Sequence, residues 1–115
     1  MSRDLSFWRT STEVEADNRA TYVALSNAKH LTYVDEIPAA KITAAFKDAF
    51  QDWENDGSGF YENGRESFQL MITKQFVRAD CYDMTKRSMN TIIDIMLEYG
   101  CPLYDSTIDV RFDGK

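Results

Sequence analysis

The sequence predicts a single α+β domain over residues 1–115, with about four to five mainly antiparallel strands and about three helices packed on one face of the sheet. Three observations support this. A chain of 115 residues with 43% hydrophobic residues suits one domain around one core. Segments of two-residue apolar alternation are interspersed with segments of helical periodicity. Two alternating segments are joined by a very short connection, which indicates a hairpin and therefore antiparallel neighbours.

The first element is a short strand over residues 4–9, DLSFWR. Leu5 and Phe7 occupy alternate positions and point to one side of this strand. Trp8 points to the other side with the polar residues, so we expect an outward, exposed position for the indole.

Two helices follow the first strand. The first is expected over roughly 16–28, with a thin apolar stripe and a cap at Asp17 or Asn18. The second begins at Pro38, because proline is tolerated in the first helical turn, and it ends at the turn-forming residues 55–59. Its apolar positions repeat at three- and four-residue spacing and form a buried face: Ile42, Ala45, Phe46, Ala49, Phe50 and Trp53.

The central strands lie in the next segment. A strand begins near residues 60–61, and Asn63-Gly64 indicates a tight turn after it. The segments 67–73 and 76–82 alternate strongly and are joined by a connection short enough for a hairpin. Inward positions are Phe68, Leu70, Ile72, Val77, Ala79 and Cys81, and Arg78 and Asp80 are outward.

A third helix and a final strand complete the predicted elements. The helix covers roughly 84–99, with Asp83 or Thr85 as its cap and Gly100 at its end. The last strand is predicted over 107–112. We expect it to point three apolar side chains into the core: Ile108, Val110 and Phe112.

Charge and composition restrict the class of partner. Thirteen basic and nineteen acidic residues give a net charge of −6, which disfavours binding to nucleic-acid phosphates and favours a basic protein partner. No apolar run is long enough to cross a membrane, and the opening residues lack a signal-peptide pattern. We therefore expect a cytoplasmic protein that binds neither nucleic acid nor membranes. Cys81 and Cys101 are too few and too isolated for a disulfide scaffold or a zinc site.

The sequence carries no pattern of catalytic residues. His30 is the only histidine, and no nucleophile elbow, phosphate loop or dinucleotide fingerprint is present. We expect no enzyme activity, no catalytic residue, no cofactor and no metal. The exposed aromatic and charged groups favour a protein contact instead. The predicted partner-binding residues are Trp8, Glu13, Glu15, Asp17, Asp52, Glu54, Asp56, Tyr61, Glu62, Arg78, Asp80 and Tyr104.

Two stretches carry a resemblance to a known group of proteins: SRDLSFW at residues 2–8 and IDIMLEYGCPLYD at residues 93–105. With them, the chain resembles small, acidic bacterial proteins encoded beside polymorphic toxins, including the immunity proteins of contact-dependent growth inhibition. The resemblance implies a cytoplasmic protein that binds a cognate toxin domain and covers its active site. It transfers no individual binding residue. The alternative is a small interaction adaptor or nucleic-acid mimic with another cytoplasmic role.

Overall fold

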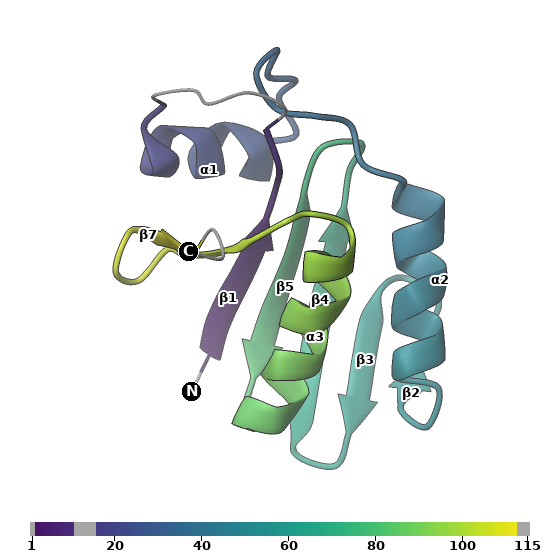
Figure 1. Cartoon of the computed structure of the whole chain (residues 1–115). Helices are drawn as coiled ribbons and strands as arrows, with labels where there is room; N and C mark the ends of the chain where they lie inside the picture. Colours follow the sequence, from purple (N-terminus) through teal and green to yellow (C-terminus); the bar gives the residue numbers. More distant parts are fainter. Residues whose placement is uncertain (1, 11–15, 113–115) are drawn as a thin grey trace.

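The structure is a computed structural model that describes residues 2–10 and 16–112 (Figure 1). Within them lie three helices and one sheet of seven strands, in the order β2-β3-β4-β5-β1-β6-β7, with every neighbouring pair antiparallel. The α+β class is confirmed, and the sheet has more strands than expected. The elements are β1 (Ser2–Phe7), α1 (Asn18–Ser26), α2 (Ala39–Ala49), β2 (Glu54–Asn55), β3 (Phe60–Asn63), β4 (Glu66–Ile72), β5 (Val77–Tyr82), α3 (Lys86–Glu98), β6 (Leu103–Asp105) and β7 (Val110–Phe112).

The strand β1 lies inside the sheet between β5 and β6. It pairs with β5 along its whole length and with β6 through Ser6 and Phe7. Because successive side chains of a strand point to opposite faces, its alternation places Leu5 and Phe7 on one face and Ser6 on the other. All three are almost fully buried, so both faces of the sheet are covered at this strand.

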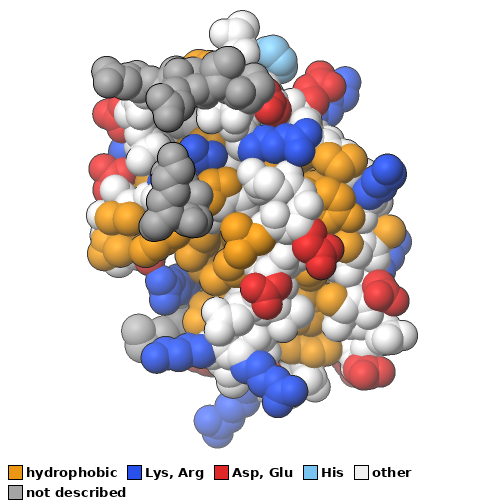
Figure 2. All heavy atoms as spheres, viewed as in Figure 1, with side chains coloured by type: hydrophobic (Ala, Val, Ile, Leu, Met, Phe, Trp, Pro, Cys, Tyr) orange, Lys and Arg blue, Asp and Glu red, His pale blue; other side chains and the backbone are white. Residues whose placement is uncertain are grey.

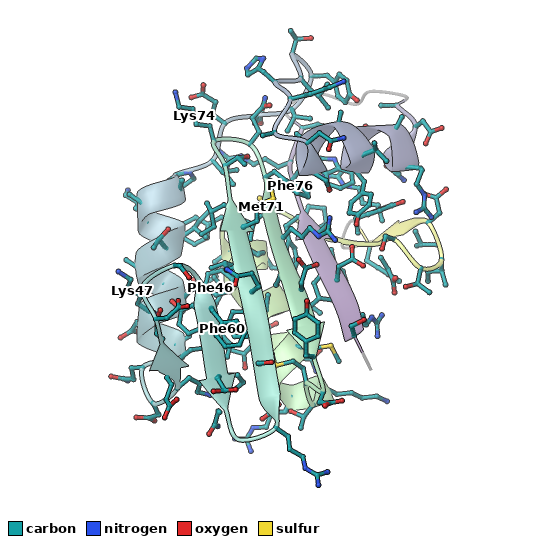
Figure 3. The ribbon with its side chains drawn as sticks, turned by 180° about the vertical axis from the view of Figure 1, so that it is seen from behind. Phe46, Lys47, Phe60, Met71, Lys74 and Phe76 are labelled. Atoms are coloured by element: carbon teal, nitrogen blue, oxygen red, sulfur yellow. The ribbon has the colours of Figure 1, made fainter. Side chains whose placement is uncertain are left out.

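The helices cover both faces of the sheet, which corrects the prediction of three helices on one face. The helical face carries α2 and α3, whose Ile42, Phe46 and Ile92 pack on Phe68 and Val77. On the opposite face, here the α1 face, a second apolar cluster joins α1 to the sheet. Figure 3, seen from behind, shows α1 in front of the strands and α3 behind them. That cluster consists of Trp8, Leu25, Val34, Phe76 and Tyr104, with Tyr22, Leu31, Tyr33 and Met71 at its margin.

The segment after α1 is fixed to the same face by one buried amide. Gln75 donates hydrogen bonds from Nε2 to the carbonyl oxygens of Leu31 and Val34, both at 2.7 Å, and its Oε1 accepts one from the Leu31 backbone N–H at 2.9 Å. Each polar atom of the Gln75 side chain is therefore satisfied although the residue is buried, as a buried amide requires.

Local signals placed several element boundaries correctly. The predicted end of the second helix at residues 55–59 is wrong, because α2 ends at Ala49 and Glu54–Asn55 pair with β3 as β2. Asp17 caps α1, accepting a hydrogen bond from the Ala20 N–H, and Thr85 caps α3 in the same way through the Ser88 N–H. Gly64 forms the turn between β3 and β4 with a positive φ, and Gly100 has a positive φ immediately after α3. Within the described residues, no helix is long and apolar enough to cross a bilayer.

The prediction of a last strand over 107–112 is wrong in two respects: the strand is shorter, and its apolar side chains do not enter the core. Residues 106–109 form a turn between β6 and β7, in which Asp105 Oδ1 accepts a hydrogen bond from the Thr107 N–H and Asp109 has a φ of 51°. Only 110–112 are extended. The apolar side chains expected in the core are exposed instead: Ile108 by 57%, Val110 by 40% and Phe112 by 48%.

Gly59 provides a test of the β3–β4 arrangement. Its φ is 97°, its carbonyl accepts a hydrogen bond from the Leu70 N–H, and a Cβ placed there would lie 2.7 Å from the Leu70 carbonyl oxygen. Gly57 also has a positive φ, but open space surrounds it. We expect Gly59→Ala to lower the free energy of unfolding by about 1 kcal/mol or more beyond Gly57→Ala, which carries only the backbone strain. Urea unfolding measures both. Equal losses would show that the close contact has no cost.

Candidate interaction surfaces

Four of the predicted contact residues meet at one edge of the sheet. Glu54 on β2 lies directly opposite Glu62 on β3, so the two side chains share a face. Asp52 lines a shallow hollow of about 340 Å³ with both of them, and Asp56 lines an adjoining hollow with the same pair. All four carboxylates are exposed. This group of Asp52, Glu54, Asp56 and Glu62 is called the acidic edge below.

The acidic edge has a cost in stability. Like charges directly opposite on paired strands destabilise the pairing, and solvent screening limits that cost. One carboxylate oxygen of Asp56 already has hydrogen-bond partners within the chain. Its Oδ1 accepts hydrogen bonds from the N–H and the hydroxyl of Ser58 at 2.8 and 2.7 Å. These bonds lower the pKa of the Asp56 carboxyl. A dense row of carboxylates at one sheet edge would attract a basic surface.

The three aromatic residues predicted as contacts are all buried, and the exposed position expected for Trp8 is therefore wrong. Trp8 and Tyr104 lie 5.2 Å apart between ring centroids, and Tyr22 of α1 packs on Tyr104 at 5.3 Å. Tyr61 stacks on Phe68 at 4.8 Å in the helical-face core. The exposure predicted for Trp8 fails because α1 covers that side of the sheet at the end of β1.

Arg78 and Asp80 face inward toward α1. Arg78 Nε donates to Asp80 Oδ1 at 2.9 Å, and its Nη1 lies 3.3 Å from Ser26 Oγ. The guanidinium carbon is 5.5 Å from the centroid of the Tyr22 ring. Burial lowers the Arg78 pKa, but the hydrogen bond and charge of Asp80, together with the charges of Tyr22 and Asp4, raise it overall. These half-buried charges join β5 to α1.

Asp4 extends the same network across the neighbouring strand. Its carboxylate accepts a hydrogen bond from the Tyr22 hydroxyl at 2.6 Å and another from the Ser106 hydroxyl at 2.8 Å. One carboxylate thereby connects β1, α1 and the turn after β6. Burial raises the Asp4 pKa, but the two hydroxyl hydrogen bonds, the charge of Arg78 and a backbone hydrogen bond together lower it below its usual value of 3.8.

The remaining predicted contacts are distributed elsewhere. Asp17 is exposed but caps α1, at the opposite end of the sheet from the acidic edge (Figure 1). Glu13 and Glu15 lie outside the described residues. The ten predicted contacts among the described residues therefore do not form one surface, because burial and the strand order separate them.

A second surface, which sequence reasoning missed, lies beside the β6–β7 hairpin. An open hollow of about 900 Å³ on the helical face is bounded by the start of α3, β1 and the turn after β6. Figure 2 shows hydrophobic side chains at the position of this hairpin and basic side chains along the lower margin of the same view. We call this hollow the hairpin groove. Its lining includes Arg3, Arg65, Met84, Met89, Asp105 and Ile108.

The signal for the hairpin groove was present in the sequence. The alternation of Ile108, Val110 and Phe112 predicts that they share one side of a strand, and the prediction of a buried side is wrong. Alternation states only that three side chains share one side of a strand. Whether that side is covered depends on the position of β7 at the end of the sheet.

Both cysteine thiols are buried and free. Burial raises the pKa of Cys81 to about 12 and that of Cys101 to about 11, so both stay protonated at neutral pH. They pack as small apolar side chains in the helical-face core, as predicted. Among the described residues, no group of three or more His, Cys, Asp or Glu side chains is placed to hold a metal ion.

Comparisons of the chain with family models, with curated proteins and with solved structures found no match.

The Asp4 network predicts a specific acid sensitivity. Because the pKa is lowered in the folded state, the stabilisation by the carboxylate is present above the unfolded value of 3.8 and is lost as pH falls through the folded value. We expect Asp4→Asn to lower the free energy of unfolding by about 1 kcal/mol at neutral pH. The difference from wild type should shrink at about pH 3.

Urea unfolding at both pH values measures this effect, with Asp94→Asn on the exposed side of α3 as the control. A difference between wild type and Asp4→Asn that stays constant with pH would contradict the role of the ionised carboxylate.

Proposed function

We propose that this chain is an immunity or inhibitor protein that binds a cognate bacterial toxin domain and covers its active site. The observation that carries the protein-binding part is the exposed hairpin β6–β7. Its Ile108, Val110 and Phe112 are each 40–57% exposed within five consecutive residues. Exposed apolar clusters of this kind mark contact sites for other macromolecules.

The acidic edge supports a toxin domain of basic character as the partner. Asp52, Glu54, Asp56 and Glu62 give one end of the sheet a dense negative charge, on a chain whose net charge is −6. Opposite charges on two surfaces accelerate their diffusional encounter. Rapid capture is useful to an inhibitor that must bind a toxin before it acts. The resemblance of residues 2–8 and 93–105 to immunity proteins supports the same partner class.

The direct test is protection of growing cells. The toxin domains encoded next to the gene are expressed one at a time, with and without this protein. We expect growth to be restored for one of them and the two proteins to copurify as a complex. Failure to protect against every neighbouring toxin domain would remove the proposal. Recovery of a housekeeping complex from the native cytoplasm would instead favour an adaptor.

The acidic edge predicts how charge reversal alters the association rate with that toxin domain. Glu54→Lys with Glu62→Lys should slow association about tenfold at low salt and much less at high salt, because salt screens exposed charges. The control reverses two exposed carboxylates of α3, Asp94→Lys with Glu98→Lys. Stopped-flow kinetics at two salt concentrations measures the rates. Equal slowing by both double variants would show that only net charge matters.

A further inference from the structure

The α1 face of the sheet is covered at one end only. In Figure 3, seen from behind, α1 lies near the upper ends of the strands, and no helix that is drawn lies in front of the lower parts of β3, β4 and β5. Directly paired residues share a face of the sheet, so the register places two rows of side chains on this part. The rows are Glu54, Glu62, Ser67, Tyr82 and Ser2, and Phe60, Gln69, Asp80 and Asp4. Each of these residues is at least partly exposed, and we call the two rows the open face.

Two aromatic rings lie on the open face. Tyr82 is 44% exposed. Phe60, labelled in Figure 3, is half-buried, and within the described residues it belongs to neither apolar cluster. It lines a hollow of about 270 Å³ whose lining also includes Glu54, Asp56 and Glu62. Aromatic side chains are enriched in protein interfaces, so this face is suited to contact with another protein.

Hydrogen bonds hold one wall of the hollow in place. The loop before Phe60 is attached to β4 at two points. Gln69 Nε2 donates to the Ser58 carbonyl oxygen at 3.2 Å. The Leu70 N–H donates to the Gly59 carbonyl oxygen at 2.8 Å. A site whose walls are fixed before binding loses less conformational entropy when a ligand binds.

The charges of the open face select a cation as the occupant of the hollow. The two rows hold four carboxylates and neither lysine nor arginine. Asp4 and Asp80 are already held by hydrogen bonds within the chain. Glu54 and Glu62 form no ion pair within the described residues, and both line the hollow. The hairpin groove has no such preference, since the charged residues in its lining are two arginines and two aspartates.

A guanidinium group fits the hollow better than an ammonium group. The guanidinium is planar, stacks on aromatic rings and binds carboxylate oxygens through two parallel N–H groups. An ammonium group is a compact and strongly hydrated charge. Phe60 provides the ring, and Glu54 and Glu62 provide the carboxylates.

We infer that the open face is the docking surface for a basic partner protein, and that an arginine side chain of the partner enters the hollow beside Phe60 and binds Glu54 and Glu62. Tyr82, further along the first row, contacts the surrounding surface of the partner. The inference rests on the proposed function for the partner being a toxin domain, and it adds where that domain binds and which side chain is recognised. The acidic edge forms the rim of this face. The apolar side chains of β7 point to the helical face and form a separate surface.

Selection from a random library of phage-displayed peptides tests this inference without a known partner. We expect the enriched sequences to share an arginine, and to lose their enrichment when the selection is repeated on the double variant Glu54→Gln with Glu62→Gln. A synthetic peptide of the enriched sequence should shift the backbone amide NMR signals of residues 54–62 and of Tyr82. Replacing its arginine by lysine should weaken binding at least about tenfold.

Matched variants locate the site. Glu54→Gln with Glu62→Gln should weaken the selected peptide at least about tenfold. The control, Asp94→Asn with Glu98→Gln, removes the same charge from exposed positions of α3 and should leave binding unchanged. The first double variant removes repulsion between directly paired carboxylates, so we expect it to stay folded. Phe60→Leu keeps an apolar side chain but removes the ring, and it should also weaken the peptide.

An unchanged melting temperature shows that each variant is folded. If Phe60→Leu unfolds, the glutamate variant and the lysine-substituted peptide still decide the question. Several outcomes would overturn the inference: no enrichment, enrichment without arginine, equal affinity of the two double variants, or NMR shifts at residues 108–112 with none on the open face.

The toxin domain separates this inference from the proposed function. If a neutralised toxin domain binds wild type and the variant Glu54→Gln with Glu62→Gln with equal dissociation constants, the proposed function stands and this docking surface is wrong. If the peptide result is positive and no neighbouring toxin domain is neutralised, the docking surface stands and only the toxin as its partner is removed.

Discussion

The structure depends on the burial of β1 on both faces and along both edges. Its backbone pairs with β5 on one side and with β6 on the other. Leu5 and Phe7 enter the core beneath α2 and α3, and Trp8, just after the strand, enters the cluster beneath α1. Without β1, no strand would join the β2–β5 meander to the β6–β7 hairpin. The two apolar clusters would also lose the strand that contributes side chains to one and leads into the other.

The central position of β1 explains why polar groups gather on the α1 face. Asp4 lies directly opposite Asp80, an arrangement of two carboxylates that is unfavourable by itself. Arg78 neutralises one of them, and the hydroxyl groups of Tyr22 and Ser106 hold the other. The same contacts that offset this repulsion attach α1 and the hairpin turn to the sheet. The outward positions of Arg78 and Asp80 predicted a solvated face of the sheet. In the structure their side chains belong to a polar network that attaches α1 to the sheet.

The sheet is open, so it has two edge strands, β2 and β7, and these two edges differ in character. One end has a short strand, β2, and a row of carboxylates, both of which discourage edge-to-edge aggregation. The other end has β7, with exposed apolar side chains and the hairpin groove beside it. An unprotected apolar edge exposes a chain to aggregation, so its presence beside a groove favours a partner that covers it. The acidic edge is suited to attract a basic partner over a distance, and the apolar hairpin β6–β7 is suited to direct contact.

The sequence by itself determined the class of the fold, the helices and their caps, the β3–β4 and β4–β5 hairpins and the burial of both cysteines. These features follow from residues close together in the chain, such as Thr85 with Ser88 or the alternation of Phe68 and Leu70. Only the tertiary structure decided that α1 covers the side of Trp8, that Arg78 and Asp80 face a helix, and that Ile108, Val110 and Phe112 remain exposed. The reason is physical: periodicity fixes which side chains share a face, whereas the order of the strands decides whether anything packs on that face.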